Sequence, residues 1–136
     1  MTETMETRIG ARIEALDLDA MTAALDRDGW AVLPRLLNDA ECDDTAALYA
    51  GEAGFRSRVV MARHGFGRGE YRYFSYPLPP LVAMLRERLY PRLAPIANRW
   101  NERMGVGVRF PADHADFLAR CHEAGQRRPT PLLLQY

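Results

Sequence analysis

The sequence predicts an α+β fold, because helical and strand-like patterns alternate along 136 residues. Apolar residues recur every three or four positions from Leu81 to Met104, which indicates a helix with one face on a core. Two runs rich in Val and Tyr, Ser57–Arg63 and Glu70–Ser75, flank a glycine-rich connection, as in a β-hairpin. A chain of this length, 48% hydrophobic, fits one domain.

Residues 1–17 are mostly polar, and we expect them to form a flexible N-terminal arm or a short helix. The next segment, Asp17–Arg27, has helical apolar spacing, and Gly29 follows it as the residue that ends a helix in the left-handed conformation. Trp30–Leu33 then has the composition of a short strand, closed by Pro34.

A helix is predicted to begin at Asn38, where Asn38 and Glu41 have the spacing of a capping box. It places Cys42, Ala46 and Tyr49 on one face. Both cysteines of the chain, Cys42 and Cys121, are expected to be buried free thiols of a cytoplasmic protein, since no signal peptide or membrane span is evident.

The C-terminal half is predicted to contain two helices and a strand. Pro91 and Pro95 should kink or divide the Leu81–Met104 helix, because each removes a backbone N–H. A shorter helix is expected at Ala112–Ala124, and the apolar run Leu132–Tyr136 is expected to be a strand. An exposed apolar strand edge invites aggregation, so this strand is either buried or part of a longer polypeptide.

Composition narrows the function classes. The net charge is +0 and basic residues are mixed with acidic ones, from which we expect neither a nucleic-acid partner nor a membrane partner. All 18 basic residues are arginines, so Schiff-base chemistry and a P-loop lysine are excluded.

For two motifs we prefer a structural interpretation to a functional one. The glycines between His64 and Gly69 precede a strand rather than a helix, so they predict a hairpin connection and not a phosphate-binding loop. The His114-x-Asp116 pair has the spacing of iron ligands on a strand, but it falls in a helical pattern, where the two side chains diverge. No metal ligands and no catalytic residues are therefore predicted in this chain.

One family resemblance covers most of the chain. Residues 28–42, Asp-Gly-Trp-Ala-Val-Leu-Pro-Arg-Leu-Leu-Asn-Asp-Ala-Glu-Cys, resemble the N-terminal signature of the Fe(II)- and 2-oxoglutarate-dependent dioxygenases near the prolyl-hydroxylase branch. Residues 70–80, 85–91 and 96–100 resemble a bacterial subgroup of these enzymes. The match would place Trp30 and Val32 inside the fold.

The resemblance implies an eight-stranded double-stranded β-helix, or jelly roll, of which this chain has only N-terminal helices and the first strands. Residues 18–136 would be the N-terminal part of one oxygenase domain that continues beyond Tyr136 and supplies the remaining partner surfaces. The complete enzyme would be a hydroxylase using Fe(II) and 2-oxoglutarate. This chain lacks the iron triad, so it is expected to bind neither and to be inactive alone.

The resemblance also implies site residues. Gln135 and Tyr136 would contact the cosubstrate, while Arg63, Tyr71 and Tyr73 would lie at the rim of the substrate site. Ordinary sheet packing is the alternative explanation for the tyrosines. The substrate itself is not indicated by the sequence.

Two other functions stay open. The chain could be a non-catalytic binding or interaction module that retains the front half of the family, in which case it binds no Fe(II). It could also be a small helical protein that binds a partner through the Leu81–Met104 face, which predicts cooperative unfolding on its own.

Overall fold

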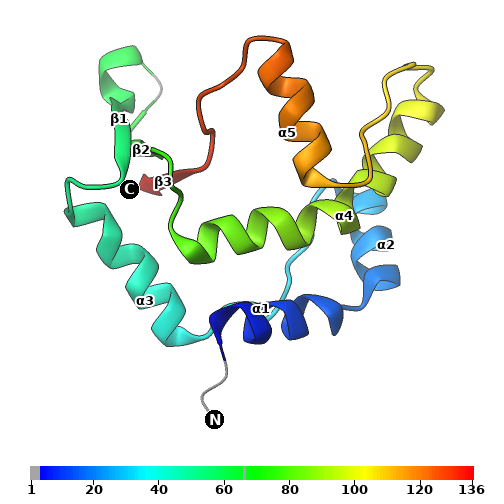
Figure 1. Ribbon diagram of the computed structural model, residues 1–136, viewed down its shortest axis with the longest axis horizontal. Coiled ribbons are helices and arrows are strands. Elements are labelled where there is room, and N and C mark those ends of the chain that lie inside the picture. The colour runs from blue at the N-terminus through cyan, green and yellow to red at the C-terminus, as the bar shows by residue number, and fades with distance from the viewer. Residues whose placement is uncertain (1–3, 66) are drawn as a thin grey trace. The chain divides into compact units, whose positions relative to one another are not determined.

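The computed structural model describes residues 4–65 and 67–136 and confirms an α+β fold (Figure 1). The chain divides into two compact units, each described separately below. The helical unit comprises Met1–Leu37 and Ala83–Gln126, and the sheet unit comprises Asn38–Val82 and Arg127–Tyr136. In chain order the elements are α1 Met5–Glu14, α2 Leu18–Asp28, α3 Asp39–Ala47, η1 Leu48–Ala50, β1 Phe55–Val60, η2 Met61–His64, β2 Glu70–Phe74, α4 Pro80–Arg103, α5 His114–Glu123 and β3 Leu132–Gln135.

The N-terminal segment is a helix rather than a flexible arm over residues 5–14. Thr4 caps α1 by accepting a hydrogen bond from the Thr7 backbone N–H, and Ile9 and Ile13 are 0% and 2% exposed. These two residues are four apart and therefore face the same side of the helix. The first three residues of the predicted arm lie outside the described part of the chain.

The second helix follows its predicted signals, but the predicted strand after it is wrong. Asp17 caps α2, and Gly29 ends it at φ 80°. Trp30–Leu33 is irregular, and Trp30 and Val32 are 63% and 70% exposed, so they do not pack inward. Strand propensity forms a strand only where a neighbouring strand pairs with it, and the described strands pair only with one another.

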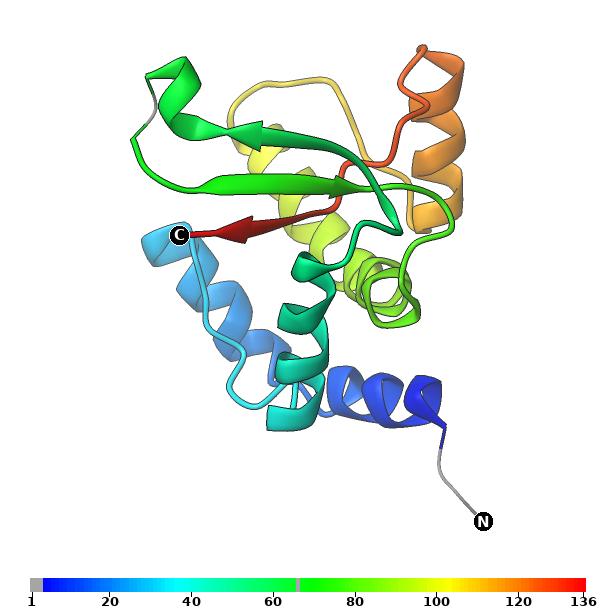
Figure 2. The same ribbon diagram turned by 90° about the vertical axis from the view of Figure 1, so that its left-hand side faces the viewer.

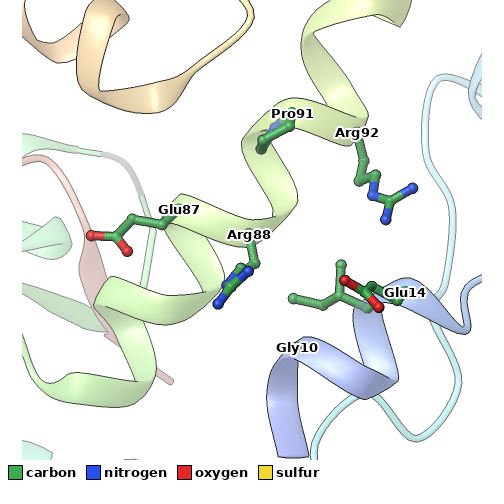
Figure 3. A pocket seen from close by; sticks show the side chains of 7 residues that line it. Gly10, Glu14, Glu87, Arg88, Pro91 and Arg92 are labelled. Carbon is green, nitrogen blue, oxygen red and sulfur yellow. The ribbon is translucent and has the colours of Figure 1, made fainter. Parts of the chain in front are cut away.

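The predicted long helix is present and is not divided by its prolines. α4 runs without interruption through Pro91 and Pro95, although its axis bends near Pro91 (Figure 3). Ala94 and Ile96, beyond the bend, are buried and anchor this half of the helix. No helix within the described residues is long and apolar enough to cross a membrane.

Side chains of α4 hold the segment that leads to α5. Asn98 donates from Nδ2 to the Phe110 carbonyl (3.0 Å) and accepts from the Phe110 N–H (2.6 Å). The Tyr90 hydroxyl donates to the Pro111 carbonyl (2.8 Å), and its ring stacks on Phe117 of α5. The Phe110 N–H and the carbonyls of Phe110 and Pro111 thus have partners within the helical unit.

The sheet unit contains the predicted hairpin and the predicted C-terminal strand. β2 lies between β1 and β3, and both pairings are antiparallel (Figure 2). Phe74, at the end of β2, is 2% exposed and stacks on Phe55 with ring centroids 5.0 Å apart. Phe74 and Leu78, which is 9% exposed, are the buried hydrophobic residues among those described in this unit.

The capping box of α3 is confirmed, with both hydrogen bonds between Asn38 and Glu41 at 2.8 Å. Glu41 is buried, whereas Cys42 is exposed and Cys121 is only partly covered. The predicted burial of Cys42 is therefore wrong. The box turns Glu41 inward, and the next residue along a helix points about 100° away.

Candidate functional site

The two faces of the sheet carry different chemistry. Side chains alternate along β2, so Tyr71 and Tyr73 share one face and Glu70 and Arg72 share the other. Gln135 pairs with Glu70 across β2 and β3, which puts it on the opposite face from the tyrosines. The predicted site residues on these strands are thus divided between the two faces.

The tyrosine face consists of the side chains of Val59, Tyr71, Tyr73, Leu132 and Leu134, which the strand register brings together. The rings of Tyr71 and Tyr73 meet edge to face, with centroids 5.6 Å apart. Leu132 and Leu134 remain 40% and 45% exposed. This is an apolar, aromatic surface that the sheet unit does not cover.

A pocket of about 480 Å³ opens at one end of the tyrosine face. Val59, Met61, His64 and Tyr71 line it, so its walls come from β1, β2 and the short helix η2. Three of the four side chains are apolar or aromatic, and His64 adds hydrogen-bonding nitrogens. Such a lining suits a flat, largely apolar ligand with polar edges.

Arg56 covers the other end of this face. Its guanidinium lies 4.4 Å from the centre of the Tyr73 ring, and its Nε donates a hydrogen bond of 3.0 Å to the Pro129 carbonyl. The stacked guanidinium occupies one side of Tyr73. Tyr71 is therefore the tyrosine available at the pocket.

The opposite face carries a network centred on Glu70. Arg58 donates to Glu70 Oε2 from Nε (2.9 Å) and from Nη2, and the Tyr49 hydroxyl donates to Oε1 (2.9 Å). Arg72 donates from Nη1 to the Tyr49 and Gly51 carbonyls at the end of η1 (2.7 and 2.6 Å). Gln135 lines a pocket of about 430 Å³ beside this network.

Hydrogen bonds and burial shift the pKa values of Glu70 and Tyr49 in this network. Those from Arg58 and then Tyr49 lower the pKa of Glu70 below its usual 4.5. Burial, followed by the hydrogen bond to Glu70, raises the pKa of Tyr49 above its usual 10.0. The carboxylate therefore stays ionised at neutral pH and ties β1, β2 and η1 together.

We expect the free energy of unfolding to depend less on pH in the acid range for Glu70→Gln than for the unmodified chain. The pKa of Glu70 is lower in the folded chain than in the unfolded chain, so its ionised carboxylate stabilises the fold at pH values above the unfolded pKa. This stability is lost as the pH falls through the folded pKa. The unmodified chain should therefore lose stability below about pH 5, more steeply than Glu70→Gln. Urea unfolding at several pH values measures this, with Glu52→Gln, at an exposed glutamate, as the control. Parallel curves for Glu70→Gln and the unmodified chain would contradict it.

Charges are segregated within the sheet unit, although the whole chain is neutral. Residues 38–52 contain five acidic residues and no arginine. The remainder of the unit, residues 53–82 and 127–136, contains seven arginines and one acidic residue, a formal charge of +6. We call this remainder the basic segment. Arg63 and Arg68, in the connection between β1 and β2, are both exposed.

The remaining sequence motifs do not form a second site. The glycines between His64 and Gly69 connect two antiparallel strands, which confirms the hairpin prediction. His114 and Asp116 lie on α5, as expected, and His114 packs edge to face on Tyr90. Among residues 4–65 and 67–136, no group of three or more His, Cys, Asp and Glu side chains could hold a metal ion.

A further pocket, of about 370 Å³, lies between α1 and α4 in the helical unit. Figure 3 shows Arg92 above Glu14 across this space, with Glu87 directed away from it. Arg88, also in its lining, makes a salt bridge of 3.2 Å to Glu6. Opposite charges line this pocket, so it favours no one class of charged ligand.

The sequence model of one protein family matches residues 69–136, half of the chain, and the chain belongs to this family, Oxygenase-NA. The family is described as "Oxygenase, catalysing oxidative methylation of damaged DNA". Two uncharacterised proteins of Mycobacterium tuberculosis, from strains CDC 1551 / Oshkosh and ATCC 25618 / H37Rv, are each 43% identical to the chain over 92 residues. This alignment covers 64% of the chain and 40% of each relative. No solved structure matches.

The family match corrects two predictions. The resemblance to the Fe(II)- and 2-oxoglutarate-dependent dioxygenases is overturned, because the matching family is a distinct one. The residue 28–42 signature lies outside the matched region, and its Trp30 is exposed rather than packed. The exclusion of nucleic acid is also wrong, since the family description names damaged DNA. The zero net charge of the whole chain gives no indication of the basic segment.

Sequence reasoning missed part of this surface. Arg63, Tyr71 and Tyr73 were predicted, but Met61 and His64 of the pocket were assigned to a strand and a loop without a role. The available signal was the local charge balance, because every acidic residue of positions 38–82 except Glu70 precedes position 53. Tyr136, which was predicted to contact the cosubstrate, is 88% exposed at the edge of the sheet.

Proposed function

We propose that this chain is the DNA-contacting part of an oxygenase that acts on damaged DNA. The observation that carries the proposal is that the exposed tyrosine face belongs to a segment with seven arginines and one acidic residue. Arginines neutralise phosphates, and aromatic side chains stack on bases whatever their sequence. The family description supplies the substrate class.

Two parts of the surface would contact different parts of the DNA. Arg63 and Arg68, at the exposed tip of the hairpin, would contact the phosphate backbone. Tyr71, the tyrosine that lines the pocket, would contact bases. The described residues contain no metal-ligand cluster, so we assign this chain the binding and positioning of DNA and derive no oxidation step from it.

The finer features of the complete protein stay predictions. A three-stranded sheet does not define a jelly roll, so that architecture stays a prediction for the complete domain. The same holds for hydroxylation, for Fe(II) and 2-oxoglutarate as cofactors, and for Gln135 and Tyr136 as cosubstrate contacts. The chain spans less than half the length of the relatives it matches.

DNA affinity of the hairpin variants tests the proposal. We expect the double substitution Arg63→Ala, Arg68→Ala to raise the Kd for single-stranded DNA on the order of tenfold near 0.1 M salt, since each lost phosphate contact removes about 0.7 from the salt exponent. Fluorescence anisotropy with a labelled oligonucleotide measures the Kd.

The matched control is Arg27→Ala with Arg103→Ala, which removes the same charge from exposed positions in the helical unit. This pair should change the Kd much less than the hairpin pair. Equal losses in the two double variants would mean that overall charge, and not the sheet, attracts DNA. A chain without measurable DNA affinity would contradict the proposed function itself.

A further inference from the structure

We infer that the pocket formed by Val59, Met61, His64 and Tyr71 holds one unpaired nucleobase of the DNA substrate. The inference rests on the proposed function and goes beyond it by naming the part of the substrate and the site that receives it. No comparison assigns any residue of this pocket.

The dimensions and lining of the pocket suit a base. Its volume of about 480 Å³ lies within the range of small-molecule sites. Val59 and Met61 provide apolar walls, and Tyr71 provides an aromatic ring. His64 supplies an imidazole ring as the polar part of the lining.

The packing around Tyr71 singles out this ring for stacking. Tyr73 meets Tyr71 at an interplanar angle of 83°, so the two rings are not stacked face to face on one another. Tyr73 itself is covered on one side by Arg56. The pocket therefore has room for a base at Tyr71, where the walls from β1 and η2 also converge.

The base must be unpaired to enter. A base within a duplex is stacked on both faces and paired along its edge, so neither an aromatic ring nor a histidine can reach it in the way this pocket requires. Arg63 belongs to the same short helix as Met61 and His64. A phosphate held by Arg63 or by the nearby Arg68 would position the attached nucleotide at the pocket entrance.

The test compares two single-stranded oligonucleotides, roughly eight nucleotides long. One has all its bases, and the other carries the same backbone with abasic sites at its central positions. The unmodified 136-residue chain should bind the abasic strand on the order of tenfold more weakly, as expected for losing one stacked base. In Tyr71→Leu this difference should shrink to less than about twofold, since leucine keeps the apolar wall but not the ring.

Tyr76→Leu is the matched control, because Tyr76 is 43% exposed and lies outside the pocket lining. It should preserve the preference for the intact strand. Equal affinity of the unmodified chain for the two strands would overturn the base pocket while leaving the DNA-binding proposal in place. No affinity for either strand would overturn both. If circular dichroism shows Tyr71→Leu to be unfolded, the comparison of strands on the unmodified chain decides alone.

Discussion

Phe74→Ala is expected to lower the free energy of unfolding of the sheet unit by about 3–5 kcal/mol, the cost of truncating a fully buried phenylalanine. Phe74 is 2% exposed, and its ring stacks on Phe55, which in turn meets Tyr49 edge to face. The alanine would leave a cavity in the one aromatic cluster that joins η1 to β1 and β2. A small three-stranded sheet has little other buried surface with which to offset this loss.

Urea unfolding followed by amide hydrogen exchange in β1 and β2 measures this effect. Both tryptophans, Trp30 and Trp100, belong to the helical unit, so tryptophan fluorescence would not report on the sheet. Tyr76→Ala, at an exposed position of the same unit, should change stability by less than about 0.5–1 kcal/mol. A loss below about 1 kcal/mol for Phe74→Ala would show that the sheet does not depend on this cluster.

Gly69→Ala is the second substitution with a large expected effect. Gly69 precedes β2 at φ 101°, a conformation that strains any residue with a Cβ, at roughly 1–3 kcal/mol. An added Cβ would also lie 2.8 Å from the Gln135 carbonyl oxygen and 3.2 Å from Tyr136 Cδ1. Because the first of these is a backbone atom, β3 would have to move away from β2.

Gly67→Ala provides a matched control for this effect. Gly67 has a similar φ of 95°, but an added Cβ would meet nothing within 4 Å. The two variants therefore share the backbone strain and differ in the contact with β3. Chemical denaturation should show a larger loss for Gly69→Ala, and hydrogen exchange should show β3 opening more readily. Equal losses would exclude steric displacement of β3.

Elements with strong local signals were predictable from the sequence. Asp17 and Gly29 bound α2, and Asn38 with Glu41 forms the capping box of α3, because hydrogen bonds within a few residues determine these ends. The hairpin was equally evident from two strand-like runs around glycines. The strand β3 was predicted, but the residues of β3 do not indicate that it pairs antiparallel with β2.

Features that depend on distant partners were not predictable. Trp30–Leu33 has the composition of a strand but lacks a neighbouring strand, and Ile9 and Ile13 of the presumed arm are buried in the helical unit. The same limit applies to the candidate site. Tyr71 and Tyr73 could be proposed from alternation along β2, whereas the pocket also needs Met61 and His64, which the short helix η2 brings beside Tyr71.

We propose that the sheet unit of this oxygenase-family chain binds DNA through its basic segment. The most direct test is the affinity of the unmodified chain for single-stranded DNA measured across salt concentrations. We predict that log Kd rises linearly with log salt concentration, with a slope of at least about 1.4, equivalent to two phosphate contacts. Binding whose Kd does not change with salt, or no binding at low salt, would contradict the claim.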